Sequence, residues 1–215
     1  MKKNVYCLID TETAKMTDVY NLGMIIFDKK GNILFEREYI NTDVFENSIL
    51  MSSAYYAYKM PLYDEKLDIV YCDTKSMMKD FFKKLEQFEV THLLAYNLKF
   101  DINSMTKTAY KYLHTEINFD NYKLVDVMRV AIETILMTEK YKGFCRENNE
   151  ITEKGNYKSS AETVYRYINN DTDFIEQHTA LSDCYCEKCI FEKCLKQKKT
   201  VSVGCKGNLW RLIQD

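Results

Sequence analysis

The chain has 215 residues, enough for one domain with a sizeable insertion and for a hydrophobic core that needs no disulfides. Hydrophobic residues make up 46% of the sequence, which excludes a wholly disordered protein, and the 6 glycines and 1 proline argue against a fibrous or linker-rich one. The 30 Lys and Arg against 32 Asp and Glu give a formal net charge of −2, which argues against a protein that coats nucleic acid through bulk positive charge. A protein that grips only a short stretch of nucleic acid stays possible.

The predicted elements begin with three β-strands. Residues 4–10 form a short apolar run, and residues 20–28 and 33–40 form two more, separated by the turn signal Lys29-Lys30-Gly31-Asn32. This order predicts a strand followed by an antiparallel hairpin. Residues 41–72, called the variable segment below, lack a clear period and contain the single proline, Pro61.

Helices and one further strand follow. Asp73 or Thr74 can cap a helix whose apolar residues recur at helical spacing, namely Met77, Met78, Phe81, Phe82 and Leu85. We predict a buried strand at 91–96, a polar, glycine-punctuated loop at 140–156, and helices at about 100–113, 123–138, 159–169 and 179–196. The predicted order is thus three strands at the start of the chain, followed by a further strand that alternates with helices. This order predicts an α/β fold, with a mixed β-sheet flanked by α-helices. We expect a single domain over 1–199 and a C-terminal tail over 200–215 that contains Trp210, with the basic run Lys196–Lys199 as a solvated helix end.

The sequence also bears on the cellular compartment. The apolar run before Asp10 is too short for a signal-peptide core, and no stretch is apolar for long enough to span a membrane, so we expect a cytoplasmic protein with no membrane partner. The 8 cysteines are then expected to be reduced thiols. Four of them, Cys184, Cys186, Cys189 and Cys194, have a spacing that lacks the paired knuckles of common zinc sites. We interpret them as buried or half-buried helix cysteines, with a zinc site as the alternative.

Acidic side chains follow two of the predicted strands. Asp10 and Glu12 come at the end of the first strand, and residues two apart in a strand face the same side, so both carboxylates project together. Two like charges beside a hydrophobic sheet are costly unless a cation lies between them. After the strand at 91–96, Asn97 can close a turn and Asp101 lies at the start of the next helix. An acid there also suits a helix N-terminus electrostatically, so helix capping is the alternative.

A histidine and a fourth acid come late in the chain, where His178 precedes Asp183 by five residues at the start of a predicted helix. Each feature alone is unremarkable, but the ordered set resembles the DEDDh branch of the DnaQ-like 3′–5′ exonucleases, whose fold is RNase H-like. The residues that carry the resemblance are Leu8-Ile9-Asp10-Thr11-Glu12-Thr13, Asn97-Leu98-Lys99-Phe100-Asp101 and His178-Thr179-Ala180-Leu181-Ser182-Asp183, with a weaker match at Val125–Ala131. The resemblance covers about residues 4–195.

The chain departs from the family pattern in two places. Ala14-Lys15 follows the first motif where the family often has glycine, and the variable segment 41–72 is longer than the simplest members require. That segment and residues 141–168 are most similar to small phage-encoded exonucleases, for which the compartment would be the host cytoplasm.

The resemblance implies a mechanism. Two Mg²⁺ ions, which Mn²⁺ can replace, would be held by Asp10, Glu12, Asp101 and Asp183, and all-oxygen ligands suit such hard cations. His178 would accept a proton from the attacking water, and nucleoside 5′-monophosphates would leave from the 3′ end of single-stranded DNA. The tyrosine branch of the family has its tyrosine four residues before the last acid; this chain has Thr179 there, which favours the histidine branch. Substrate contacts are expected from Thr11, Thr13, Asn97 and Phe100, with Lys15 and Lys99 nearby.

Several alternatives stay open from the sequence. The substrate could be RNA, which makes the protein an exoribonuclease, or the chain could be a non-catalytic nucleic-acid-binding module on the same scaffold. Tyr55, Tyr56 and Tyr58 could stack on a terminal base, but helical packing is the favoured interpretation. Asp126 and Arg129 are expected to form a structural pair or to support the site from behind.

Overall fold

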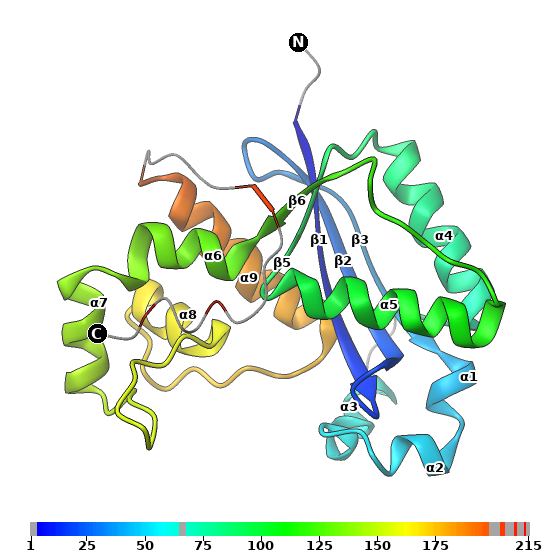
Figure 1. Cartoon of the computed structure of the whole chain (residues 1–215), viewed down its shortest axis with the longest axis horizontal. Helices are drawn as coiled ribbons and strands as arrows, with labels where there is room; N and C mark the ends of the chain where they lie inside the picture. The colour runs from blue at the N-terminus through cyan, green and yellow to red at the C-terminus, as the bar shows by residue number, and fades with distance from the viewer. Residues whose placement is uncertain (1–3, 65–67, 198–202, 205–208, 210–212, 214–215) are drawn as a thin grey trace.

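A six-stranded mixed sheet with the order β4-β3-β2-β1-β5-β6 forms the centre of the molecule (Figure 1). The computed structural model describes residues 4–64, 68–197, 203–204, 209 and 213. Within this part of the chain the predicted mixed sheet flanked by helices is confirmed. The strands are β1 (Val5–Ala14), β2 (Asp18–Asp28), β3 (Ile33–Asn41), β4 (Ile69–Cys72), β5 (His92–Ala95) and β6 (Lys123–Asp126).

The strands β1, β2 and β3 form the predicted antiparallel meander, and β1 pairs in parallel with β5. The turn between β2 and β3 is closed by the Asp28 carboxylate, which accepts the backbone N–H groups of Lys30 and Asn32, while Gly31 adopts a φ of +89°. The first strand runs further than predicted: it continues to Ala14, so Asp10 and Glu12 lie within it rather than at its end. Its outer half pairs only with β2, because the pairing with β5 stops at Leu8.

The helices follow the predicted order with some corrections. They are α1 (Thr42–Phe45), α2 (Ser48–Met51), α3 (Pro61–Asp64), α4 (Thr74–Gln87), α5 (Leu98–Leu113), α6 (Val127–Ala131), α7 (Glu139–Glu147), α8 (Ala161–Asn169) and α9 (Ala180–Leu195), with short turns η1 (Ala57–Lys59) and η2 (Ile132–Leu136). Asp73 caps α4 by accepting the Ser76 N–H. The helix predicted at 123–138 is wrong in its first part, because residues 123–126 pair with β5 as β6. The loop predicted at 140–156 is wrong over α7, and the variable segment contains α1, α2, α3 and β4 rather than irregular chain alone.

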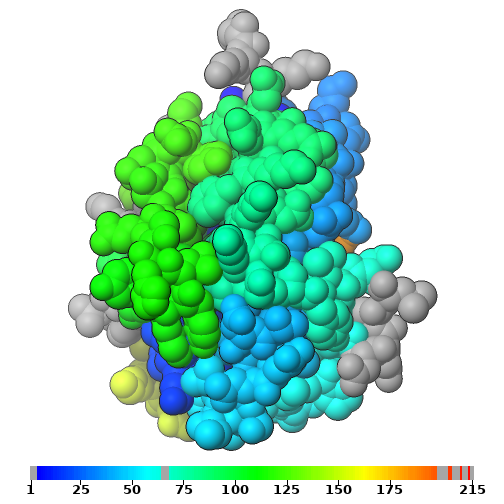
Figure 2. Space-filling model, turned by 90° about the vertical axis from the view of Figure 1, so that its right-hand side faces the viewer, coloured from blue at the N-terminus to red at the C-terminus, as the bar shows by residue number. Residues whose placement is uncertain are grey.

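The sheet separates two hydrophobic layers, and Figure 1 shows helices on both of its sides. Helices α4 and α5 cover one face, with Met77, Phe81 and Leu85 in the core between them and the sheet. Helices α6 and α9 cover the other face, with Val130, Ile190 and Phe191 in that core. A smaller core joins the variable segment to the start of β2 and the end of β3, and Figure 2 shows this segment at the lower end of the face covered by α4 and α5.

The end of the chain contributes to the core beside α6 and α9. Leu209 and Ile213, from the predicted tail, are buried there, and Gly204 bridges to Val125. Lys198, Lys199 and Trp210 lie outside the described residues, and the boundary at residue 199 stays a prediction. Within the described residues, none of the helices has the length and apolar character needed to cross a membrane.

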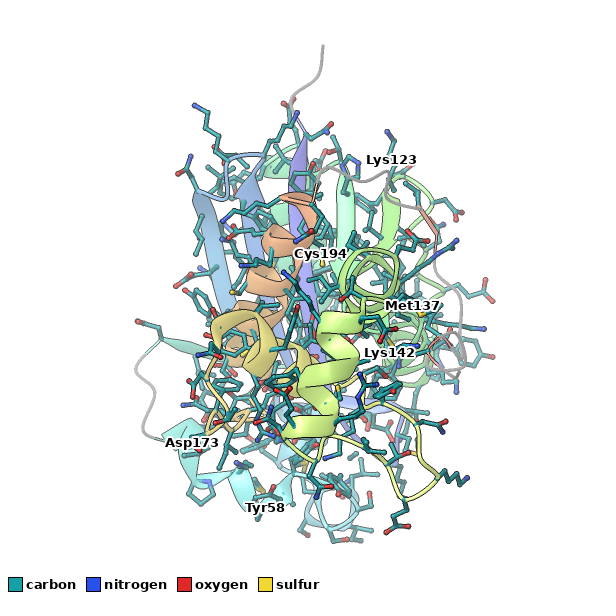
Figure 3. All side chains as sticks on the ribbon, turned by 90° about the vertical axis from the view of Figure 1, so that its left-hand side faces the viewer. Tyr58, Lys123, Met137, Lys142, Asp173 and Cys194 are labelled. Atoms are coloured by element: carbon teal, nitrogen blue, oxygen red, sulfur yellow. The ribbon has the colours of Figure 1, made fainter. Side chains whose placement is uncertain are left out.

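The cysteines of α9 behave as the helix interpretation predicts. Cys184, Cys186 and Cys194 are buried and Cys189 is half-buried. Figure 3 shows Cys194 on α9, where this helix lies over the sheet. In the described part of the chain, the groups of side chains close enough to share a metal ion contain carboxylates and His178 but none of these cysteines.

Candidate active site

A cavity of about 240 Å³ lies where β1 runs past the carboxyl end of β5. This is the end of the molecule that Tyr58 marks in Figure 3, opposite Lys123 at the start of β6. The cavity is lined by Asp10, Thr11, Glu12, Tyr56, Tyr96, Phe100, Asp101, Ala161, Glu176, His178, Asp183 and Glu187. The four acids and the histidine predicted from the sequence therefore lie together, with Thr11 and Phe100. Thr13 and Asn97 are not among the described residues that line it.

Asp10 and Glu12 reach the cavity from β1 by the predicted alternation of the strand. They lie opposite Gly23 and Asn21 of β2, and the pairing shifts by a β-bulge immediately after Glu12. Glu12 is only 8% exposed. Between them, Thr11 donates its hydroxyl to Asp101 Oδ1 at 2.8 Å, so this hydroxyl orients an acid of the site.

Asp101 comes from the first turn of α5, and the tight turn before this helix is held by two buried carboxylates. Asn97 adopts a left-handed conformation with a φ of +68°. Glu187 accepts the backbone N–H of Tyr96 at 2.9 Å, and Asp126 accepts that of Asn97 at 3.3 Å. The predicted turn at Asn97 is thus confirmed, and its position is fixed from α9 and from the end of β6.

Asp126 and Arg129, expected to form a structural pair or to support the site, are joined through the Arg129 backbone and not through both side chains. Asp126 caps α6 by accepting the backbone N–H of Arg129, whereas the Arg129 guanidinium pairs with Glu133 at 3.0 Å. Asp126 therefore contributes to the site through the Asn97 turn. Burial raises its pKa to about 6, although backbone donors oppose this shift.

His178 and Asp183 enter the cavity at the start of α9. Asp183 lies in the first turn of this helix, and His178 precedes it with a left-handed φ of +55°. His178 Nδ1 lies 3.8 Å from a carboxylate oxygen of Glu176 and 3.8 Å from one of Asp183, beyond hydrogen-bond range. Burial, and then the charge of Lys59, lower the His178 pKa below its usual value, so the imidazole is neutral at pH 7 and can accept a proton.

The start of α9 is seated directly on β2. A Cβ atom at Gly23 would lie 2.4 Å from the Ala180 carbonyl carbon, so only glycine allows this approach. Beside it, Asn21 Oδ1 accepts the Ala180 N–H at 2.8 Å and the Tyr63 hydroxyl at 3.0 Å. The Asn21 amide group donates to Glu38 and to the Tyr39 carbonyl, which satisfies this fully buried side chain.

Sequence reasoning missed Glu176 and Glu187, and it considered Tyr56 only as a possible base-stacking ring with helical packing favoured. Glu187 could have been found, because it follows Asp183 by one helical turn and so faces the same side of α9. Glu176 lies two residues before His178, in a loop with no period to indicate where it points. Tyr56 comes from the variable segment, and its ring stacks on His178 with the centroids 4.0 Å apart and the planes at 12°. No pattern along the chain predicts that contact.

The acids of the cavity share one electrostatic property. Burial and then neighbouring negative charges raise the pKa of Asp10, and they raise that of Glu12 to about 9 and that of Glu176 to about 8. Burial raises the Asp101 pKa to about 8 even though the Thr11 hydroxyl lowers it. Since burial and mutual repulsion both disfavour the charged forms, the cluster favours a bound cation.

The donor set fits a hard divalent cation. One oxygen of Asp10, Oδ2, is buried and has no hydrogen-bond partner among the described residues, which is costly unless a ligand occupies that position. Ligand atoms of Glu12, His178 and Asp183 lie within 4.8 Å of one another, and so do those of Glu162, Glu176 and His178. Carboxylate oxygens in this density are the ligands that Mg²⁺ and Mn²⁺ prefer.

No protein-family model and no curated protein sequence matches the chain. Among solved structures, E. coli exonuclease I in complex with a 5cy-dT13 oligonucleotide is similar over 92% of this chain, with a TM-score of 0.59 and 12% identity. Exonuclease I in complex with the inhibitor BCBP is similar over 93% of the chain, with a TM-score of 0.54 and 12% identity. The chain spans 41% and 42% of the lengths of those chains. The likeness confirms the predicted RNase H-like α/β fold.

Proposed function

We propose that the protein is a metal-dependent 3′–5′ exonuclease that releases nucleoside 5′-monophosphates from single-stranded DNA. The observation that carries the proposal is the convergence of Asp10, Glu12, Asp101 and Asp183 with His178 in one cavity, in the order along the chain that the DEDDh resemblance requires. The shared fold with exonuclease I, which has been solved with a dT oligonucleotide, supports DNA as the substrate.

The four DEDDh carboxylates would hold the metal ions, with Asp10 at the centre of the set. Two Mg²⁺ ions, when bound, would activate the attacking water and stabilise the leaving oxygen. The protein's own contribution is to fix the ligands: β1 presents Asp10 and Glu12, the Asn97 turn presents Asp101, and α9 presents Asp183.

His178 would act as the proton acceptor. Its ring lines the cavity, its lowered pKa keeps it neutral at pH 7, and the nearby Asp183 carboxylate would stabilise the imidazolium that forms. The backbone at this position is left-handed, which asparagine tolerates better than most residues.

The test follows the fate of a 5′-labelled strand. Single-stranded DNA and RNA of one sequence are incubated with Mg²⁺, with Mn²⁺ or with EDTA, and mass spectrometry identifies the mononucleotide. We expect a ladder that shortens from the 3′ end only with a divalent cation, faster on DNA than on RNA. Faster cleavage of RNA would make the protein an exoribonuclease. Tight binding without cleavage of either strand would indicate a binding module instead.

The role of His178 has a matched pair of variants. His178→Asn and His114→Asn both replace a histidine in a left-handed conformation, and His114 lies at the exposed end of α5. His178→Asn should lower kcat by about 10²-fold or more with little change in DNA binding, while His114→Asn should keep the wild-type rate. An unchanged kcat in His178→Asn would remove this residue from the proton-transfer step.

A further inference from the structure

The variable segment has an inner and an outer side. Leu50, Met51, Ala54 and Tyr63 are buried in the small core that joins the segment to the sheet. Tyr55 and Tyr58 are 82% and 68% exposed, so the favoured prediction of helical packing is wrong for these two rings. Because the inner residues already anchor the segment, Tyr55 and Tyr58 are not needed to hold it in place.

The exposed tyrosines are continuous with the candidate active site through Tyr56. The Tyr56 ring stacks on His178, while Tyr55 contacts Tyr56 edge-on at 4.8 Å and Tyr58 lies 6.2 Å from Tyr56. Figure 3 shows Tyr58 at the same end of the molecule as Asp173, which belongs to the loop that leads into His178. Aromatic surface therefore extends from the cavity to the outside of the protein.

A positive charge accompanies these rings. Lys59 Nζ lies 5.3 Å from the centroid of the Tyr58 ring, and its charge is felt at His178, whose pKa it helps to lower. Alternating aromatic rings and cations are the feature by which proteins hold single strands, with rings against bases and cations against phosphates. The acids of the cavity are repulsive to a phosphate chain, so a cation at the rim favours a strand that arrives over this segment.

We propose that Tyr55, Tyr56, Tyr58 and Lys59, named the tyrosine platform, form a binding site for unpaired nucleobases of the strand that enters the cavity. The inference rests on the proposed nucleic-acid substrate and adds how that substrate is selected. A base presents its face to a ring only when its neighbours are unstacked, so the platform selects a frayed or single-stranded end over a paired one. Every base has such a face, so the site is expected to tolerate any sequence.

The test uses two dT oligonucleotides that differ only in the bases offered to the platform. One is unmodified, and the other has abasic residues just 5′ of its terminal nucleotide, so both keep the same scissile phosphate. Affinity is measured by fluorescence anisotropy with Asp183→Asn protein and Mg²⁺, and kcat/KM is measured with the active protein. With the platform residues unchanged, we expect the affinity and the kcat/KM for the unmodified strand to exceed those for the abasic strand by about tenfold or more.

The variants separate stacking from charge. The double variant Tyr55→Ala/Tyr58→Ala should bring the ratio between the unmodified and the abasic strand close to one. The variant Tyr55→Phe/Tyr58→Phe, which keeps both rings, should keep the wild-type ratio. Tyr110→Ala removes a tyrosine that is also exposed, at 62%, but belongs to α5, and should change nothing. Lys59→Gln should weaken both oligonucleotides equally and reduce the slope of log affinity against log salt by about 0.7. The three tyrosines are exposed and Lys59 is half-buried, so we expect these variants to keep the fold, which a thermal melt checks.

The outcomes distinguish this inference from the exonuclease proposal. If the wild-type protein prefers the unmodified strand and the Tyr55→Ala/Tyr58→Ala variant keeps that preference, the platform proposal is overturned. This holds even if the strand is cleaved from its 3′ end. The absence of any preference in the wild-type protein overturns it as well. Base-dependent binding that the double variant abolishes supports the platform, even if no cleavage occurs and the exonuclease proposal fails.

Discussion

Two of the places where carboxylates are buried, the surroundings of Glu150 and the cavity, are built in opposite ways. Glu150 is 6% exposed and is held by Lys158 at 2.8 Å and by Arg166 at 2.6 Å. Burial alone would raise its pKa, but these two cations lower it overall. In the cavity, Asp10 and Glu12 face other acids, and their pKa values are raised.

The opposite electrostatics of the two clusters indicate different roles. The cluster around Glu150 attracts its own members and so ties α8 to the end of α7, which is a structural role. The acids of the cavity repel one another, so the surrounding framework must hold them in place until a cation arrives. A protein tolerates such a destabilising arrangement where function requires it.

Replacing Asp10 should have a greater effect on activity than any other substitution considered below. Asp10→Asn removes the carboxylate whose Oδ2 lacks a partner, so nuclease activity should fall by about 10³-fold or more. In EDTA the same variant should be as stable as the wild type or more stable, because the amide cannot acquire the negative charge that burial and the neighbouring acids disfavour. Initial rates on labelled DNA and urea unfolding in EDTA measure the two effects.

Glu150→Gln is the matched control for that variant. It leaves Lys158 and Arg166 without their charged partner, so the free energy of unfolding should fall by about 3 kcal/mol while kcat is retained. If Asp10→Asn proved the more destabilising of the two in EDTA, the carboxylate of Asp10 would be a structural group and the comparison would be wrong.

The second prediction concerns the framework that holds the repelling acids. Gly23→Ala places a Cβ 2.4 Å from the backbone of Ala180, so the start of α9 must shift and carry His178 and Asp183 away from Asp10. We expect a loss of about 10²-fold in activity and about 1–3 kcal/mol in stability. Gly143→Ala in α7 is the control, since no atom of the described residues, its own neighbours and helix backbone aside, lies within 4 Å of the added Cβ, and it should be neutral or slightly stabilising. If Gly23→Ala and Gly143→Ala lost similar activity and stability, the close approach of α9 to Gly23 would not explain the loss.

These contacts show where sequence reasoning succeeded and where it stopped. The meander of β1 to β3 and the helices α4, α5, α8 and α9 follow from hydrophobic periodicity and caps, which are local signals. Lys123–Asp126 was predicted as part of a helix, because its apolar residues run on into α6 and only the pairing with β5 makes it a strand. The helix α7 is polar and contains Gly143, and it is held by its cap at Thr138 and by the buried Tyr141 and Cys145.

The same distinction between local signals and contacts over long sequence separations applies to the residues of the site. Asp10, Glu12, Asp101, His178 and Asp183 were predicted because their order and spacing carry a motif. Asn21, Gly23 and Tyr56 act through contacts with residues far along the chain, and nothing near them in the sequence indicates those partners. The meeting of these five side chains in one cavity was therefore predictable, but the supports that hold them together were not.

The third prediction tests one of those supports. Asn21→Ala leaves the Ala180 N–H and the Tyr63 hydroxyl without their acceptor, which should cost about 3 kcal/mol of stability and lower kcat about tenfold. Asn41→Ala is the matched control: Asn41 is equally buried and bonds the Val19 carbonyl and the Thr74 hydroxyl, with no bond to α9. It should lose similar stability in urea and keep kcat, measured where both variants are folded. Equal losses of kcat would mean that Asn21 acts only through stability.

The smallest effect is a dependence of stability on pH, and its sign differs between the two clusters. The pKa values of Glu12, at about 9, and of Asp101 and Glu176, at about 8, lie above those of the unfolded chain. Between about pH 5 and pH 8 the folded protein therefore holds protons that the unfolded chain has released, and the free energy of unfolding in EDTA should fall as pH rises. The slope is about 1.4 kcal/mol per pH unit for each proton so held.

Glu150 should contribute in the opposite direction, because its lowered pKa means that its stabilisation is lost as pH falls through that value. Urea unfolding at several pH values, with EDTA and with Mg²⁺, separates the clusters, since a bound cation neutralises the cavity and should flatten the decline at high pH. Glu150→Gln should remove the loss at low pH and leave the decline at high pH unchanged. A stability in EDTA that rises steadily from about pH 5 to pH 8 would mean that the acids of the cavity are already compensated by the protein, and the need for a cation there would disappear.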